Sequence, residues 1–129
     1  MISVVCIDDN SIDLKIHSRV IERSGVGQLV RAFTLATEAL EWFRSENQPA
    51  VDLILLDINM PMMNGFEFLE EFMKLDLTKT LVVCLVSTSE NPKDLERAET
   101  LGAKFNSKPL TKSGFIELVD SLFGSGKKI

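Results

Sequence analysis

A short apolar run that ends in a carboxylate, Leu53 to Leu56 followed by Asp57, constrains the fold of this chain more than any other feature. Four apolar residues bounded by turn signals are typical of a strand that is buried on both faces of a parallel sheet. The turn that follows is built on Pro61 and closed by Gly65. We therefore expect Asp57 at the carboxyl edge of a sheet, which is where open α/β sheets bind their ligands.

Four other apolar runs of strand length alternate with helical patterns along the 129 residues. These runs span residues 2–7, 28–33, 81–86 and 103–107. Asn10, Asn91 and Thr111 are placed to cap the helices that follow the first, fourth and fifth strands. The helix after Asn91 is expected to turn Leu95 and Ala98 inward.

The helix after Asn10 carries an apolar stripe. Ile12, Ile16 and Val20 recur every four residues, so they predict the face that packs on the core. His17 is the only histidine and lies off this stripe, so it is predicted to face solvent.

Strands that alternate with helices predict an α/β domain with a parallel sheet between two helical layers, which is a three-layer sandwich of doubly wound (βα)5 topology. We expect the strand order 2-1-3-4-5, in which the first and third strands lie side by side at the switch point. That order brings Asp8 and Asp9, which follow the first strand, next to Asp57. Ser87 and Lys108 then lie at the ends of neighbouring strands.

Composition and charge exclude several classes of protein. The net charge of −5 and the pI near 4.9 argue against nucleic-acid binding, which needs clustered Lys and Arg. Cys6 and Cys84 lie inside strand-like runs and are expected to be buried thiols in a reducing compartment. The absence of a leader and of a long apolar segment predicts a cytoplasmic protein that does not enter a membrane. We expect one domain over residues 1–123 and a flexible tail over residues 124–129.

Three carboxylates within a few ångströms repel one another, and a hard divalent cation such as Mg2+ relieves the repulsion. A carboxylate such as Asp57 can then attack a phosphoryl group and form an aspartyl phosphate. Lys108 would neutralise the charge of that group and the Ser87 hydroxyl would donate to one of its oxygens. The residues therefore predict phosphoryl chemistry at this edge.

This set of residues resembles the receiver domain of two-component response regulators of the chemotaxis type, which has a flavodoxin-like fold. The resemblance covers residues 2–123 and combines five short pieces, each weak alone and specific together. The pieces are Asp8-Asp9, Asp57-Ile-Asn-Met-Pro-Met-Met-Asn-Gly65, Val86-Ser87, Gly102-Ala103 and Lys108-Pro109.

The resemblance implies a role for each matching residue. Asp57 corresponds to the phosphoacceptor, which also binds the metal. Asp9 corresponds to a direct ligand of Mg2+ or Mn2+, and Asp8 to a ligand that acts through water. Asn59 would offer its backbone carbonyl to the same ion.

The resemblance also implies switch and structural residues. Ser87 and Lys108 would contact the phosphoryl group, and Phe105 matches the aromatic switch position. The bond between Lys108 and Pro109 is expected to be cis, while Pro61 and Gly65 shape the turn after the acceptor strand.

The chain departs from the family pattern at three places. Thr88 stands where the family usually has Ala or Gly, so either Ser87 or Thr88 can be the switch hydroxyl, and we favour Ser87. The segment 102–108 is one residue shorter than usual. Leu110 stands where the family often has Phe.

We therefore interpret the chain as a stand-alone phosphoacceptor switch rather than an enzyme, with only slow self-catalysed phosphorylation and dephosphorylation. Its donor would be a histidine kinase or a histidine phosphotransfer protein. One alternative is an adaptor of the same fold that acts without phosphate. A phosphatase of the haloacid dehalogenase type is a poorer fit, because it needs an acidic residue where this chain has Asn59.

The output surface is expected on the fourth helix, fifth strand and fifth helix. It would bind a downstream protein or a second copy of the chain. In such a homodimer Arg97 would pair with Glu117 and Asp120 across a two-fold axis.

Overall fold

The computed structural model describes residues 1–45, 48–77, 81–89 and 91–124. Its strands are β1 (Ile2–Ile7), β2 (Gly27–Phe33), β3 (Leu53–Leu56), β4 (Val82–Ser87) and β5 (Lys104–Ser107). Its helices are α1 (Ser11–Ser24), α2 (Ala36–Arg44), α3 (Gly65–Met73), α4 (Pro92–Thr100) and α5 (Lys112–Val119), and α5 continues into a π-helical turn, Asp120–Gly124. The predicted tail lies outside the described residues except for Gly124.

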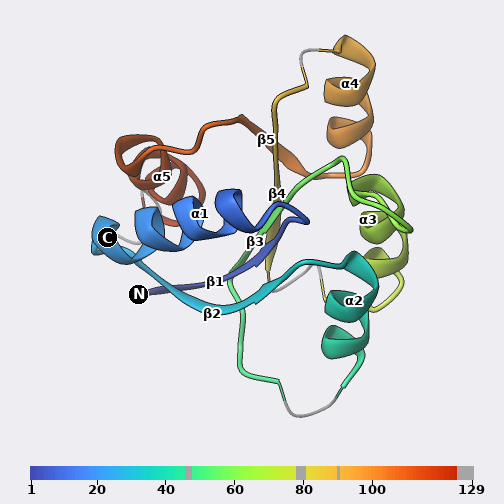
Figure 1. Ribbon diagram of the computed structural model, residues 1–129, viewed down its shortest axis with the longest axis horizontal. Helices are drawn as coiled ribbons and strands as arrows, with labels where there is room; N and C mark the ends of the chain where they lie inside the picture. The colour runs from blue at the N-terminus through green and yellow to red at the C-terminus, as the bar shows by residue number, and fades with distance from the viewer. Residues whose placement is uncertain (46–47, 78–80, 90, 125–129) are drawn as a thin grey trace.

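The five strands form one parallel sheet in the order β2-β1-β3-β4-β5, which confirms the predicted topology (Figure 1). Strand β1 lies between β2 and β3 and pairs with both, and its residue Ile7 is aligned with both Phe33 and Leu56. Because the register is set by side chains that are buried on both faces, the residues that follow β1 and β3 leave the sheet at the same level.

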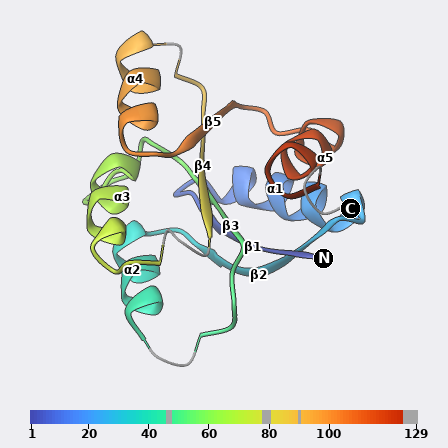
Figure 2. The same ribbon diagram turned by 180° about the vertical axis from the view of Figure 1, so that it is seen from behind.

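Helices cover both faces of the sheet, and each face has its own core. Helices α1 and α5 lie on one face and α2, α3 and α4 on the other, as the two opposite views show (Figures 1 and 2). Alternate residues of β1 and β3 point to opposite cores: Val4 and Leu53 face α1 and α5, while Val5 and Ile54 face α2 and α3. The buried strands position the site, since they leave little freedom to the residues at their ends.

The cap predictions are confirmed. Asn10 accepts from the backbone amide of Ile12, Asn91 accepts from Lys93, and Thr111 accepts from Gly114. Each side chain satisfies amides that the first helical turn leaves without an intrahelical partner. These caps fix where the helices begin, directly beyond the ends of β1, β4 and β5.

The predicted inner face of α1 is wrong for Ile12 and Ile16, whereas Val20 is partly buried and packs against the core under α1. Ile12 is 67% exposed and Ile16 is 42% exposed, whereas the buried residues of α1 are Leu14, His17 and Ile21. Both sets have helical spacing, so periodicity alone does not choose between them. The buried set includes the polar His17, so the set with Ile12 and Ile16 looked more apolar in the sequence. For this reason His17 was wrongly predicted to face solvent.

The predicted inward position of Leu95 is also wrong, since this side chain is 45% exposed while Ala98 is buried. Helix α4 lies at the edge of the sheet beside β5, where little of its surface can be covered (Figure 1). Cys6 and Cys84 are buried free thiols, as predicted. None of the described helices has both the length and the apolar character that a membrane span requires.

Candidate functional site

Three carboxylates meet at the carboxyl edge of β1 and β3. The Asp57 amide donates to the Ile7 carbonyl at 2.9 Å, and the Asp8 amide donates to the Phe33 carbonyl at 3.0 Å. Asp8 and Asp57 are buried and Asp9 is exposed. One carboxylate oxygen from each of the three lies within 4.8 Å of the others. Oxygen donors at this spacing fit a hard divalent cation such as Mg2+.

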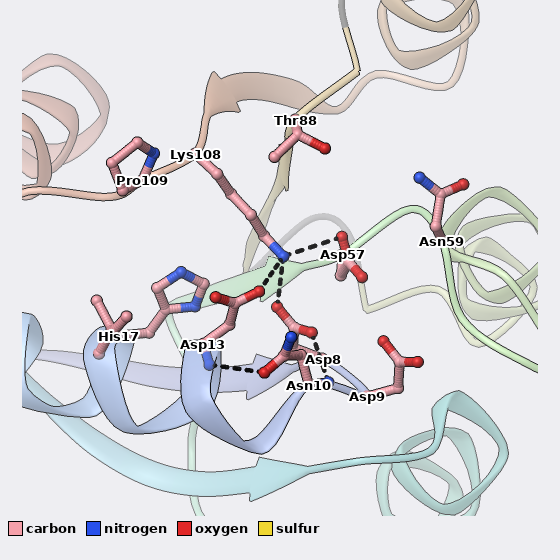
Figure 3. A pocket seen from close by; sticks show the side chains of 11 residues that line it. Asp8, Asp9, Asn10, Asp13, His17, Asp57, Asn59, Thr88, Lys108 and Pro109 are labelled. Carbon is pink, nitrogen blue, oxygen red and sulfur yellow. Dashed lines mark hydrogen bonds and ion pairs between the residues drawn. The ribbon is translucent and has the colours of Figure 1, made fainter.

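Lys108 supplies positive charge to this cluster. Its Nζ donates to Asp8 Oδ2 at 2.8 Å and to Asp13 Oδ2 at 2.8 Å, and it forms an ion pair with Asp57 Oδ1 at 3.4 Å (Figure 3). Burial lowers the pKa of Lys108, but the hydrogen bonds to Asp13 and Asp8 and the charge of Asp57 outweigh it, so the pKa lies above its ordinary value. Lys108 is therefore charged at neutral pH.

The Asp57 carboxylate is held in an environment that disfavours its charge. Burial raises the pKa of Asp57 to about 6, the charge of Asp8 adds to this effect, and Lys108 opposes it. The proton is thus bound more tightly than in the unfolded chain. A cation at the acidic cluster would favour the ionised form, which is the form that can act as a nucleophile.

The side chains surround a pocket of about 400 Å³. It is lined by Asp8, Asp9, Asn10, Asp13, Ile16, His17, Asp57, Asn59, Thr88, Lys108 and Pro109. The pocket is large enough for a phosphoryl group together with bound water. All four predicted metal-binding residues line it, whereas of the two candidate switch hydroxyls only Thr88 does.

Gly65 is required by the path of the chain after Asp57. Its amide donates to the Ile58 carbonyl at 2.8 Å, and a Cβ on Gly65 would lie 2.4 Å from the Asp57 carbonyl oxygen. No side chain fits at that distance. Asn64 then caps α3 through a reciprocal capping box with Glu67. Gly65 and the cap therefore keep the acceptor loop close to the start of α3.

Ser87 is the last residue of β4 and is buried. Its hydroxyl accepts from the Ser89 amide at 3.1 Å, and its carbonyl accepts from the Lys108 amide at 3.0 Å. Ser87 thus connects β4 to the lysine, while the exposed Thr88 side chain lines the pocket. The choice between the two hydroxyls as switch stays a prediction.

The peptide bond between Lys108 and Pro109 is cis, as the family resemblance implied. Phe105 on β5 is partly buried and packs against the core on the α2 and α3 face. Its proposed movement is not tested by a single structure. Leu110 is buried in the opposite core, so an apolar residue is required there.

Sequence reasoning did not place four residues at the pocket that line it, Asn10, Asp13, Ile16 and His17, of which Asp13 and His17 are titratable. Asp13 was considered only as part of a helix cap, although it follows Asn10 by three residues and therefore points back over the end of β1. His17 is four residues further along the same helix and is 4% exposed. Burial lowers the pKa of His17, and the charge of Asp8 opposes this effect only in part. The lowered pKa favours the neutral imidazole at pH 7.

Comparison with known proteins decides the family. The family model of the response regulator receiver domain matches the sequence of this chain over residues 4–120. The chain is a receiver domain of the response regulator family. Receiver domains are the signalling switches of two-component systems. The polar-differentiation response regulator DivK of Brucella anthropi is 32% identical to this receiver domain over 123 residues, which cover 95% of this chain and 96% of DivK.

Solved structures agree with this assignment. A chain of the CheX–CheY–BeF3–Mg complex from Borrelia burgdorferi superposes on the receiver domain with a TM-score of 0.83 at 25% identity, and the match covers 95% of this chain and 89% of that one. A two-component response regulator from Legionella pneumophila gives a TM-score of 0.80 at 28% identity, with coverage of 95% and 98%. The fold is therefore that of a receiver domain.

The raised pKa of Asp57 predicts how the Asp57→Asn variant of this receiver domain depends on pH. The folded state binds the Asp57 proton more tightly than the unfolded state, whose pKa is 3.8. The charged group therefore destabilises the fold fully above about pH 6 and not at all below pH 3.8. Without added metal, the neutral Asn variant should be more stable than wild type at pH 7.5. The gain should shrink as the pH falls toward 4.

Urea unfolding of both proteins from pH 4 to 7.5 measures this difference, and the titrating groups that lie away from Asp57 cancel in the comparison. If Asp57→Asn is instead less stable than wild type by the same amount at pH 4 and at pH 7.5, the folded state does not disfavour the ionised form of Asp57.

Proposed function

We propose that this receiver domain is a phosphoacceptor switch that takes a phosphoryl group on Asp57. The observation that carries the proposal is the position of the Asp57 carboxylate, which is buried beside two further carboxylates and 3.4 Å from the Lys108 ammonium. A nucleophile, a candidate cation site and a fixed positive charge thus meet in one pocket. These are the parts that phosphoryl transfer needs, because its catalysis is mainly positioning and electrostatic stabilisation.

Asp9 and Asp57 would hold Mg2+ or Mn2+ directly, the Asn59 carbonyl would add a ligand, and Asp8 would act through water. When bound, the cation supplies charge neutralisation for the oxygens of the incoming group. Lys108 neutralises the same charge from the other side. A hydroxyl from Ser87 or Thr88 donates to a phosphoryl oxygen, and Thr88 already lines the pocket.

In the transfer, one Asp57 carboxylate oxygen forms a bond to phosphorus while the bond between phosphorus and the donor histidine nitrogen breaks. The electron pair of that bond stays on the ring nitrogen. The donor leaves as neutral imidazole when its other ring nitrogen carries a proton. The product is an acyl phosphate on Asp57, which brings about −1.5 to −2 charges into the pocket.

The other interpretations fit the pocket less well. A phosphate-independent adaptor has no need for an Asp57 carboxylate whose pKa is raised by burial and by the charges of Asp8 and Asp9. A phosphatase of the haloacid dehalogenase type needs a proton donor two residues after the nucleophile, where Asn59 has no proton to give. We therefore favour a signalling switch over an enzyme. We also propose that this switch works in the cytoplasm.

The donor docks, in this proposal, on the exposed face of α1. Ile12, Ile16 and Val20 line a groove of about 430 Å³, which also contacts the basic side chains Lys15, Arg19, Arg23 and Lys112. The groove is next to the pocket, since Ile16 lines both. An apolar centre with a basic rim suits an acidic amphipathic helix, such as one of a histidine phosphotransfer protein or histidine kinase.

The output partner would use the face of α4, β5 and α5. Arg97, which a homodimer would need, is already paired with Glu70 at 3.5 Å and lies over the Phe66 ring at 4.6 Å. A homodimer through Arg97 would compete with both contacts, so we favour a separate downstream protein. Sedimentation with the phosphoryl mimic beryllofluoride checks this choice, because a dimer formed through Arg97 would contradict it.

Asp57 is expected to gain one phosphoryl group from acetyl phosphate in the presence of Mg2+. Intact mass measures the gain, and EDTA should prevent it. Asp57→Asn should abolish it, because the amide is not a nucleophile. The matched control is Asp52→Asn, which alters a carboxylate outside the pocket that accepts from the Ser3 amide. Labelling that survives in Asp57→Asn but is lost in another pocket variant would place the acceptor elsewhere.

The basic rim is expected to matter for protein donors only. Arg19→Glu together with Arg23→Glu should slow phosphotransfer from a phosphorylated histidine phosphotransfer protein by about tenfold at low salt, because steering by charge is lost. Labelling by acetyl phosphate should not change. Lys93→Glu on α4 serves as a charge-reversal control away from the groove. Equal slowing by the Lys93 variant, or no slowing by the α1 variant, would exclude this groove as the donor site.

A further inference from the structure

The Asp13 carboxylate binds the pocket lysine without belonging to the acidic cluster. Its Oδ2 accepts from Lys108 Nζ at 2.8 Å, the same distance as Asp8 Oδ2. The group of carboxylates that can share one cation, among the described residues, consists of Asp8, Asp9 and Asp57. Asp13 therefore acts on the lysine and not on the candidate metal position.

Helix α1 fixes Asp13 in this place. Its backbone amide donates to the Asn10 side chain at 3.2 Å, as part of the helix cap. The next residue, Leu14, is buried in the core under α1. The carboxylate thus extends from the first turn of a well-anchored helix, and only its own side-chain rotation can carry it away from Lys108.

Asp13 and Asp57 compete for one ammonium group. Figure 3 shows the Lys108 ammonium between them, with Asp13 on the side of α1 and Asp57 on the other. The distances favour Asp13, at 2.8 Å against 3.4 Å for Asp57. His17 offers Asp13 no second positive charge, because burial keeps its imidazole neutral at pH 7. Within the described residues, Lys108 is the only cation within 4.0 Å of Asp13.

We propose that Asp13 is a positioning residue that holds the Lys108 ammonium back from the acceptor and so limits how readily Asp57 takes a phosphoryl group. This inference rests on the proposed phosphoacceptor function. A phosphoryl group on Asp57 carries more charge than the carboxylate, so it attracts the ammonium away from Asp13. Phosphorylation then breaks a link to the first turn of α1, the helix that lines the donor groove.

The test is the affinity of the receiver domain for beryllofluoride with saturating Mg2+, followed by NMR. Asp13→Asn keeps the size and the helix position but removes the competing charge. It should bind the mimic about threefold to tenfold more tightly than wild type, because charge-assisted hydrogen bonds are the strong ones. Asp13→Ser should give the same gain, and Asp13→Glu, which keeps the charge, should restore affinity close to wild type.

The Lys108→Met background separates the proposed mechanism from a general effect of charge. If Asp13 acts through the lysine, Asp13→Asn changes nothing when Lys108 is Met, so the two substitutions are not additive. A gain of equal size in both backgrounds shows a through-space effect and overturns the proposal, as does no gain in the wild-type background. If the wild-type protein itself fails to bind the mimic, the phosphoacceptor function is wrong instead.

Discussion

Repulsion among three carboxylates at one edge of the sheet, offset in part by the ammonium group of Lys108, is the interaction on which the rest of the site depends. Asp8, Asp9 and Asp57 are brought within reach of one another by the register of β1 and β3. Lys108 offsets part of their charge and is divided among Asp8, Asp13 and Asp57. Because the site carries more negative than positive charge, a divalent cation would stabilise it. In the absence of a cation, the Asp57 carboxylate binds its proton more tightly than usual.

The fold holds this arrangement in place from several directions. The Asp57 amide is tied to β1 through the Ile7 carbonyl, and the Lys108 amide is tied to β4 through the Ser87 carbonyl. Gly65 brings the start of α3 against the backbone of Asp57. Because the backbone is held at each of these points, we expect a change of charge on Asp57 to move side chains and not the backbone. The main change expected is in which carboxylates the Lys108 ammonium contacts.

Much of this could be predicted from the sequence. The apolar strands are buried on both faces, so their runs are clear, and the residues that follow them fall at one edge for topological reasons. The caps at Asn10, Asn91 and Thr111 depend on local chemistry and were therefore predictable. The positions of Asp8, Asp9, Asp57 and Lys108 were predictable because these residues follow directly after the strands β1, β3 and β5.

The errors came from α1 and α4, where local pattern does not decide the outcome. Two sets of residues on α1 have helical spacing, and the set that contains the polar His17 is the buried one. Choosing it requires knowing that α1 runs past the acidic pocket. Asp13 was missed for the same reason, since its partner Lys108 is 95 residues away in the chain. Leu95 is exposed because α4 lies beside an edge strand, which the residues of α4 do not reveal.

The most direct test of the balance of charges at this edge is a titration with Mg2+, followed by amide NMR of wild type, Asp9→Asn and Asp8→Asn. The wild type should bind one ion, with shifts that centre on Asp8, Asp9, Asp57 and Asn59. Asp9→Asn should weaken binding by about tenfold or more because a carboxylate ligand is lost, and Asp8→Asn should weaken it less. Wild-type Mg2+ affinity in both variants would contradict the account, because the carboxylates would then not form the metal site.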